Sequence, residues 1–258
     1  MATNKNIMKQ LLTSVFIFLL MLTFFACSKI DNYPAPGDTI TGSTIDEGTD
    51  STVQTEIGGG GTRVKLLETS YDSAPVPIYF QSMQNGDFND TKVFGATYKI
   101  TVEGPFVPLV QTDSVGQVTA DSSQTIVLKN TATLHFYVQP FLRVQWVGNP
   151  LINADTTVSV QVIITRGTSN PAYQQDITDI NLYVSNTQYD GNNNYDPRYS
   201  NLTSYSGSAG DSLLGKTITL TTVGGALPAQ DVYFRVGARI NAGLDEYNYN
   251  APVSITYP

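Results

Sequence analysis

Beyond residue 38, apolar and polar residues alternate in short runs that end at turn-forming residues. A period of two places apolar side chains on one face of a β-strand, and Gly, Pro, Asn and Asp between runs favour turns. No stretch of ten residues in this part of the chain has a helical period free of Gly, Pro and strand-forming residues. Strands are therefore predicted at 39–45, 62–68, 76–83, 97–103, 125–128, 131–139, 142–147, 157–165, 177–184, 217–222, 232–240 and 253–257.

The number and spacing of these strands predict an all-β chain made of two tandem antiparallel β-sandwiches. Because Pro140 cannot donate to a strand ladder, we expect one sandwich at 39–139 and the other at 140–258. Arg235 and Arg239 alternate with apolar residues on one strand and are expected to face outward. Three apolar rows are expected to face the second core: Leu142, Val144 and Trp146; Val158, Val160, Val162 and Ile164; Val232, Phe234, Val236 and Ala238.

The chain begins with Lys5 and Lys9, followed by an uncharged, mostly apolar run from Leu11 to Ala26. The run is shorter than the ~20 residues of a membrane-spanning helix. Polar, turn-forming residues follow it at once, so residues 1–26 are predicted to be a signal peptide.

Cys27 follows a small residue at the end of the apolar run, an arrangement that resembles a bacterial lipobox. Phe24 stands where Leu or Val is commoner in that motif. The resemblance implies cleavage before Cys27 and acylation of the cysteine with chains such as palmitate. Two or more chains suffice for stable anchoring to the outer membrane. A plain signal peptide followed by a free thiol is the alternative.

The residues after Cys27 bear on which side of the outer membrane the protein faces. Lys29 and Asp31 are similar to the lysine-then-acid export signal of Bacteroidota surface lipoproteins, which usually has a second acid. The similarity implies a position at the cell surface. Residues 27–38 contain Pro34 and Pro36 and no apolar period, so they are expected to form a tether.

Composition and charge narrow the set of partners. Only 14% of the residues are charged, and the formal net charge is −8. A nucleic-acid-binding protein gathers Lys and Arg to neutralise phosphates, and this chain has no such cluster, so no nucleic acid is expected as a partner. Cys27 is the only cysteine, so no disulfide within the chain supports the sandwiches.

Each half of the chain resembles a known type of sandwich. In the prealbumin-like, carboxypeptidase regulatory-like family, a Gly-x-hydrophobic opening strand, a turn before Phe and a Gly-x-Tyr strand recur in this order. The second half is similar to a fibronectin type III or immunoglobulin-like sandwich, and the lack of an immunoglobulin cysteine pair favours the fibronectin-like variant. The segments that resemble the prealbumin-like family are Thr39–Glu47, Arg63–Glu68, Asn85–Asp90 and Val93–Thr101.

Nearly all of the mature chain resembles a Bacteroidota outer-membrane lipoprotein family of unknown function that pairs these two domains. Members accompany SusC/SusD-like uptake proteins, so the resemblance implies a non-catalytic binding or accessory role in glycan or nutrient uptake. It implies SusC/SusD-like proteins and polysaccharide as partners. A structural or protein-interaction module is the alternative, and a hydrolase is a minor one. The segments that carry the resemblance are Lys65–Ser70, Gly95–Pro108, Leu142–Gly148, Thr165–Gln175 and Tyr233–Arg239.

Few residues are suited to catalysis. His135 is the only histidine, and it alternates with Leu134 and Phe136, so it is expected to face outward on a strand. The chain has no Gly-x-Ser-x-Gly elbow. A glycosidase needs two carboxylates about 5–10 Å apart, and a chain with 22 acidic residues could contain such a pair. However, neither of the two resembled sandwich families is usually catalytic. We predict no catalytic residues and no cofactor.

The segment Gln188–Tyr205 is the richest polar stretch of the chain. Tyrosine rings pack on the C–H faces of sugars, Asn and Arg side chains bind hydroxyl groups, and loops on a rigid sandwich commonly carry binding sites. The alternative is that the tyrosines, with Tyr247 and Tyr249, fold back onto the sandwich. The candidate ligand-binding residues are Tyr189, Asn192, Asn194, Tyr195, Arg198 and Tyr199.

The same segment has part of a calcium-loop pattern. Asp190, Asn192, Asn194 and Asp196 alternate like the first oxygen ligands of such a loop. The full signature has Gly at its sixth position and an acid at its twelfth, where this chain has Tyr195 and Asn201. A calcium site is thus a secondary interpretation of this segment. The main one is that its Asn, Asp and Gly residues form Asx-turns in an exposed loop. No other metal site is expected.

Overall fold

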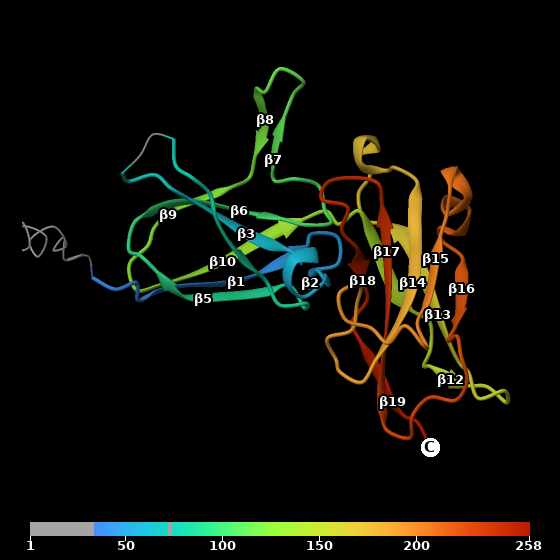
Figure 1. The fold of residues 1–258 in the computed structure, drawn as a ribbon. Coiled ribbons are helices and arrows are strands. Elements are labelled where there is room, and N and C mark those ends of the chain that lie inside the picture. Colours follow the sequence, from blue (N-terminus) through green and yellow to red (C-terminus); the bar gives the residue numbers. More distant parts are fainter. Residues whose placement is uncertain (1–33, 72–73) are drawn as a thin grey trace, which may run out of the picture. The chain divides into compact units, whose positions relative to one another are not determined.

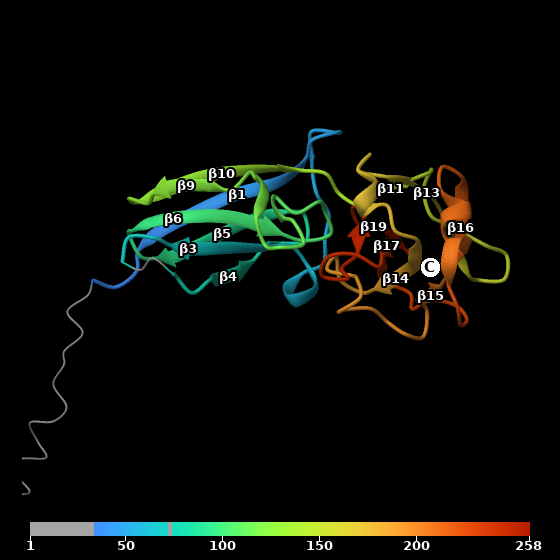
Figure 2. The ribbon, with the colours of Figure 1, turned by 90° about the horizontal axis from the view of Figure 1, so that it is seen from above.

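The alternating runs form two β-sandwiches, one before and one after Pro140 (Figures 1 and 2). The computed structural model describes residues 34–71 and 74–258, and Pro36–Pro258 forms one compact unit. The signal peptide, Cys27, Lys29 and Asp31 lie outside the described residues, so the statements about them stay predictions. Within the described part of the chain, no helix is long and apolar enough to cross a membrane.

The first sandwich contains two four-stranded sheets. In one, β1 (Asp38–Asp46) lies between β10 (Thr131–Val138) on one side and β5 (Asp87–Val93) and β2 (Ser51–Thr52) on the other. The second sheet has the order β4 (Ile78–Gln81), β3 (Arg63–Glu68), β6 (Thr97–Glu103) and β9 (Gln124–Val127). A hairpin of β7 (Val110–Thr112) and β8 (Val118–Asp121) projects from these sheets in Figure 1, and η1 (Gly58–Gly60) is one 3-10 turn.

Alternation along each strand forms the first core. On β10, Leu134, Phe136 and Val138 are buried while His135 and Tyr137 face outward. Their inward side chains pack with residues of the facing sheet such as Val64 and Ile100. Strand pairs of the described residues are antiparallel except β1–β10, which runs parallel from Thr39↔Thr131 to Asp46↔Val138.

The second sandwich is built in the same way. In one sheet, β11 (Leu142–Trp146) and β12 (Leu151–Ile152) lie along one edge of β13 (Val158–Arg166), and β16 (Thr217–Thr221) lies along the other. The facing sheet has the order β15 (Asn201–Ser204), β14 (Ile177–Ser185) and β17 (Asp231–Ile240), followed by β18 (Asn248–Tyr249) and β19 (Val253–Thr256). The remaining 3-10 turns are η2 (Pro171–Tyr173), η3 (Gly207–Ala209) and η4 (Asp211–Leu213).

The predicted apolar rows of β11, β13 and β17 form the second core, with one residue at its rim. Trp146 is only half-buried: its ring packs against the core, and its Nε1 donates to the Ala251 carbonyl at 2.8 Å. The all-β sandwich class is therefore confirmed. The sheets change between β10 and β11, beside Pro140, but a division of the chain into folding domains there stays a prediction.

The alternation does not predict β5, β15 or the β7–β8 hairpin. On β5 the inward residues Phe88 and Val93 are five positions apart, because the pairing with β1 shifts register between Asp38 and Ile40. The polar residues between them are typical of a turn. The turn before Phe88 that the family resemblance implies lies at 84–86, directly before the strand. The period of two is thus hidden by a β-bulge.

The outer face of β14 and β17 is buried as well as the inner one. Arg235 is 0% exposed, so the prediction that it faces solvent is wrong. Its side chain does point away from the core, as alternation requires, but that face is covered by the 186–200 segment and by residues of the first sandwich. Arg239, on the same face, is half-buried and donates to Asp179 Oδ2 at 2.6 Å.

Candidate functional site

The segment between β14 and β15 contains all the candidate ligand residues, and it is held down at both ends. Asp196 N donates to the Val184 carbonyl at 2.7 Å, and Ser200 N donates to the Asp196 carbonyl at 3.0 Å. Gly191 and Asn194 form a two-way backbone bridge at 3.1 Å. Asn194 Nδ2 also donates to the Tyr189 carbonyl at 3.0 Å. These bonds give the segment a defined conformation although it carries little regular structure.

One side of this segment rests on the first sandwich. Glu56, which is 2% exposed, accepts from the backbone N–H of Asn192 at 2.8 Å and of Asn193 at 3.3 Å. Gln84 Nε2 donates to the Gln188 carbonyl at 2.6 Å. Carboxylate bonds to backbone N–H groups are charge-assisted and about twice as strong as neutral ones. The inner side of the segment is therefore fixed by Glu56 and Gln84.

Arg235 lies at the centre of this contact. Its Nη1 donates to Gln84 Oε1 and to the Asp190 carbonyl, both at 3.2 Å, and its Nε donates to the Asn250 carbonyl at 2.9 Å. Its guanidinium lies 4.3 Å from the centre of the Tyr249 ring. A buried cation is costly unless it is hydrogen-bonded, and these carbonyl oxygens with the Tyr249 ring compensate in part for the loss of water around Arg235.

Four tyrosines form a cluster on the same sheet face: Tyr183, Tyr247 and Tyr249 are buried, and Tyr195 packs against them. The Tyr183 and Tyr195 ring centres are 5.5 Å apart, and the Tyr249 hydroxyl donates to Glu56. Burial raises the pKa of Tyr249 well above its ordinary value, so its hydroxyl stays a donor. A Cβ at Gly237 would lie 2.7 Å from the Tyr249 ring, so only glycine leaves room for the cluster.

Asp190 is the group in this region that lacks side-chain partners. It is 0% exposed, and neither of its carboxylate oxygens has a hydrogen-bond partner. Burial raises the pKa of Asp190 to about 7, the nearby positive charge of Arg235 opposes that rise, and Glu56 adds to it. At neutral pH a proton on Asp190 is thus nearly in balance with the charged form.

The outer side of the segment borders a cleft of about 370 Å³. Its wall is completed by residues from the end of β14 and from the stretch that precedes β17, including Asn186, Pro228 and Gln230. Arg198 is bidentate on Asp196, with Nη2 2.7 Å from Oδ2, and its guanidinium lies 5.2 Å from the centre of the Tyr199 ring. The cleft, here called the Tyr195 cleft, thus combines two phenol rings, amide groups and a guanidinium.

The structure brings four of the six candidate ligand residues together. Asn194, Tyr195, Arg198 and Tyr199 line the Tyr195 cleft. Tyr189 is exposed outside it, and Asn192 faces the first sandwich, where its backbone N–H is held by Glu56. The alternative, in which the tyrosines fold back onto the sandwich, also describes part of the arrangement. Tyr195 and Tyr199 each pack one side against the sandwich. The two rings are therefore anchored and still accessible from the cleft.

The four candidate calcium ligands have separate surroundings. Asp190 is buried beside Arg235, while Asp196 is paired with Arg198. The Asn192 side chain accepts from the Tyr183 hydroxyl at 3.4 Å, and that of Asn194 donates to Thr187 Oγ1 at 3.2 Å. Within residues 34–71 and 74–258, no group of three or more His, Cys, Asp and Glu side chains could hold a metal ion.

His135 has a hydroxyl partner but lies apart from the cleft. Its Nδ1 is 2.9 Å from Ser43 Oγ on the neighbouring strand β1. Neither residue lines the Tyr195 cleft, and the described residues show no third group on the ring that would orient it as a base for Ser43. The pair is a cross-strand hydrogen bond on the outer face of the first sandwich.

The residues that position the cleft could not be found from sequence patterns. Glu56 and Gln84 sit in irregular stretches more than 100 positions before the groups that they bind. No sequence signal existed for Arg235 either, because the outward set of β17 contains Asp231, Arg235 and Arg239, as in a strand with one face in solvent, although the strand is buried on both faces from Phe234 to Ala238.

We predict that Asp190→Asn flattens the pH dependence of stability. With a pKa of about 7 folded and 3.8 as the ordinary value, the folded state keeps a proton that the unfolded state loses. Asp190 therefore lowers the free energy of unfolding as pH rises from about 4 to 7, by on the order of 4 kcal/mol. Urea unfolding at about pH 4 and pH 8 should show Asp190→Asn gaining stability relative to wild type at the higher pH.

Asp176→Asn is the matched control, because Asp176 is exposed and the described residues offer its side chain no hydrogen-bond partner. Asp176→Asn should leave the difference in the free energy of unfolding between about pH 4 and pH 8 as it is in the wild type. If Asp190→Asn and Asp176→Asn give the same pH dependence, Asp190 is not the buried acid described above.

Comparison with known proteins places the chain in a family. No protein-family model and no curated protein matches it. A DUF3823 family protein from Bacteroides uniformis is 32% identical, with a TM-score of 0.79 over 86% of this chain and 100% of that one. A second DUF3823 family protein, from Parabacteroides merdae, is 20% identical, with a TM-score of 0.64 over 86% of this chain and 100% of that one.

A candidate carbohydrate binding protein from Bacteroides uniformis also shares the fold, at 21% identity and a TM-score of 0.60 over 86% of this chain and 99% of that one. Likenesses at this identity concern the fold alone. The first similarity is stronger, because it combines 32% identity with the whole length of the matched protein. The chain therefore belongs to the DUF3823 family.

Proposed function

We propose that the protein is a non-catalytic, carbohydrate-binding lipoprotein of the outer membrane. The observation that carries the binding role is the Tyr195 cleft, where Tyr195, Tyr199, Arg198 and Asn194 converge. Its volume of about 370 Å³ lies within the range of small-ligand pockets, roughly 300–1,000 Å³. The name of the structurally similar candidate carbohydrate binding protein agrees with this role, but the proposal rests on the cleft.

The chemistry of the cleft suits a sugar better than an apolar ligand. Each phenol offers a ring face to the C–H groups of a pyranose and a hydroxyl to its oxygens. Arg198 Nη1 has no partner among the described residues, so it is available to donate to a sugar oxygen. Because Arg198 is held by Asp196 and lies over the Tyr199 ring, little side-chain entropy is lost when a ligand binds.

The proposed location follows from the start of the chain. Acylation of Cys27 would anchor the protein in the outer membrane, and Lys29 with Asp31 would direct it to the cell surface. The tether would then hold the sandwiches away from the membrane. In that place a carbohydrate-binding protein would serve a nutrient-uptake system, with SusC/SusD-like transport proteins as partners.

A second candidate function is a protein-interaction module, and one feature of the first sandwich favours it. Strand β4 ends its sheet, with no strand of the described residues on its outer edge. Val76, Ile78, Tyr79 and Met83 beside this edge are 82%, 53%, 41% and 45% exposed. Open apolar edges invite pairing with another chain. Co-purification with an outer-membrane transport protein, together with no glycan binding, would favour this function.

We predict that polysaccharide binding depends on the Tyr195 cleft. Isothermal titration against a panel of soluble polysaccharides should find saturable binding. Tyr195→Ala and Tyr199→Ala should each weaken it by about tenfold or more, because a stacked aromatic ring contributes on the order of 1 kcal/mol beyond the area it buries. Arg198→Ala should weaken it as well, and because the Arg198 side chain is 70% exposed, this change leaves the core intact.

Tyr137→Ala is the control for the tyrosine variants, since Tyr137 is 53% exposed on β10 of the first sandwich. It should bind as wild type does. Equal affinity of the wild type, Tyr195→Ala and Arg198→Ala would rule the cleft out as the binding site, and no saturable binding to any polysaccharide would overturn the function.

We also predict that lipid is attached at Cys27. Cells that express the wild-type chain and are fed radioactive palmitate should label the protein, and Cys27→Ser should incorporate no label because the thiol is the acceptor. Ser28→Ala, which leaves the thiol in place, should be labelled normally. Palmitate incorporation into Cys27→Ser equal to that of the wild type would contradict the anchoring.

A further inference from the structure

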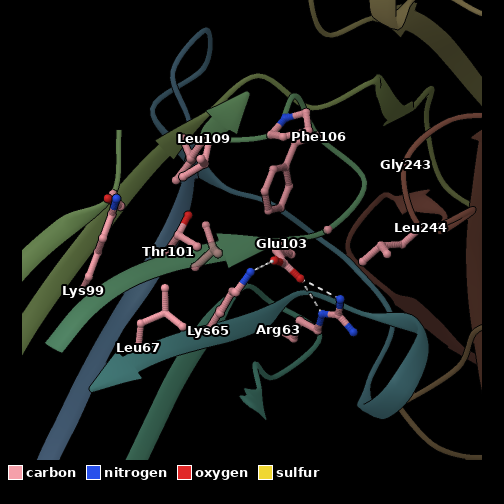
Figure 3. Close-up of a pocket in the computed structure, with 15 residues that line it drawn as sticks. Arg63, Lys65, Leu67, Lys99, Thr101, Glu103, Phe106, Leu109, Gly243 and Leu244 are labelled. Carbon is pink, nitrogen blue, oxygen red and sulfur yellow. Dashed lines mark hydrogen bonds and ion pairs between the residues drawn. The ribbon is translucent and has the colours of Figure 1, made fainter. Parts of the chain in front are cut away.

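The second cavity of interest lies on the outer face of the sheet that contains β3 and β6, and it shares no residue with the Tyr195 cleft (Figure 3). It has a volume of about 500 Å³. Its floor consists of outward-facing side chains of two neighbouring strands, where the register sets Arg63 opposite Glu103 and Leu67 opposite Lys99. We call it the β3–β6 pocket.

One part of the wall is aliphatic. Leu67 lies on the floor, Pro108 and Leu109 come from the segment between β6 and the β7–β8 hairpin, and Val110 is the first residue of β7. Leu244, from the turn after β17, closes one side and is 45% exposed. The tyrosine rings of the Tyr195 cleft have no counterpart here, and Phe106 is buried to 1%. Branched aliphatic side chains fit an alkyl chain, and no exposed aromatic ring among the lining residues offers the flat face on which a sugar ring stacks.

The polar end of the pocket has one positive charge in excess. Glu103 is the shared partner of two cations: Arg63 Nη2 lies 2.6 Å from Oε2, and Lys65 Nζ lies 3.2 Å from Oε1. Figure 3 shows both side chains pointing toward this one carboxylate. Lys99 is neutralised separately by Asp121 at 2.5 Å. The cluster of Arg63, Lys65 and Glu103 can therefore accept one more negative group.

The cations are also placed for binding. The Arg63 guanidinium lies 4.5 Å from the centre of the Tyr79 ring, and Lys65 Nζ lies 6.0 Å from it. The ring and Glu103 together hold both side chains in position, so a ligand would not have to order them. Each cation is about one-third exposed or less, which strengthens its attraction for an anion over that of a free surface lysine.

Glu246 adds a titratable group near this cluster. It is 9% exposed, and its Oε2 has no hydrogen-bond partner. Burial raises the pKa of Glu246 to about 7, while Arg63 lowers it and Glu103 raises it. Those two charged groups face Glu246 from β3 and β6. When Glu246 is protonated, the cluster of Arg63, Lys65 and Glu103 keeps its excess positive charge. When Glu246 is ionised, its negative charge cancels that excess.

We propose that the β3–β6 pocket binds a small amphiphile with an aliphatic body and one anionic head group, the body against Leu67, Leu109 and Leu244 and the head against Arg63 and Lys65. This site is independent of carbohydrate binding at the Tyr195 cleft. Charge complementarity selects the anion, and the aliphatic wall selects the alkyl chain.

Isothermal titration of the full chain with decanoate, below its micelle concentration, tests the proposal. Decanoate should bind saturably at about pH 6, whereas acetate, which lacks the chain, and decyltrimethylammonium, which reverses the charge, should not. Lys65→Gln should weaken decanoate binding by about tenfold, as expected for a lost charged hydrogen bond. Leu244→Asp should abolish it, since it places an anion in the aliphatic wall.

Matched controls exist for both variants. Lys92→Gln removes the same charge from exposed Lys92 on β5, and Leu202→Asp changes a residue that is 49% exposed on β15, against 45% for Leu244. Both should bind decanoate as the wild type does, and so should Tyr195→Ala, which separates this site from the carbohydrate cleft. Raising the pH to about 8.5 should weaken binding several-fold, and Glu246→Gln should remove that pH effect.

The proposal is overturned if decanoate does not bind, or if it binds Lys65→Gln and Leu244→Asp as tightly as the wild type. Equal binding of decyltrimethylammonium would show that the cations do not select the ligand. Sedimentation tests whether a second copy of the chain occupies the pocket instead. If the protein does not bind decanoate but self-associates, and Leu244→Asp abolishes the self-association, a second copy covers the pocket.

Discussion

The burial of one guanidinium group, that of Arg235, is the constraint on which the arrangement of the candidate binding loop depends. A charged group removed from water is costly unless it is hydrogen-bonded, and the penalty is several kcal/mol even after relaxation. Arg235 obtains its hydrogen bonds from Gln84 in the first sandwich, Asp190 in the 186–200 segment and Asn250 after β18. These parts of the chain must therefore be in place together.

The same contacts explain why the loop has two different sides. Glu56 and Gln84 bind its backbone from the first sandwich, so the backbone N–H of Asn192 faces inward, and the side chain of Asp190 is buried. The next residues turn outward and line the Tyr195 cleft. The tyrosine cluster supports this arrangement, because Tyr195 packs one face on Tyr183 and leaves the other side to the cleft. A ligand would thus meet side chains that are already positioned.

Much of the fold could be predicted from alternation, because inward and outward residues of β10, β11 and β13 differ clearly in polarity. Alternation failed at β5, where a bulge hides the period, and at Arg235, where it gave the right face but could not show that the face is covered. The tyrosine-rich loop was found from composition alone. Glu56, Gln84 and the β3–β6 pocket were out of reach, because they depend on contacts between distant segments that no local pattern encodes.

The comparison of Arg235→Met with Arg198→Met in urea unfolding tests the central role of Arg235 most directly. Arg198 is the control, because its side chain is 70% exposed and its ion pair with Asp196 lies at the surface. Arg235→Met should lower the free energy of unfolding by about 3–5 kcal/mol, because the carbonyl oxygens of Gln84, Asp190 and Asn250 lose their donor in a buried place, at roughly 1–3 kcal/mol each. Arg198→Met should cost about 1 kcal/mol or less. Equal, small losses for the two variants would contradict the account.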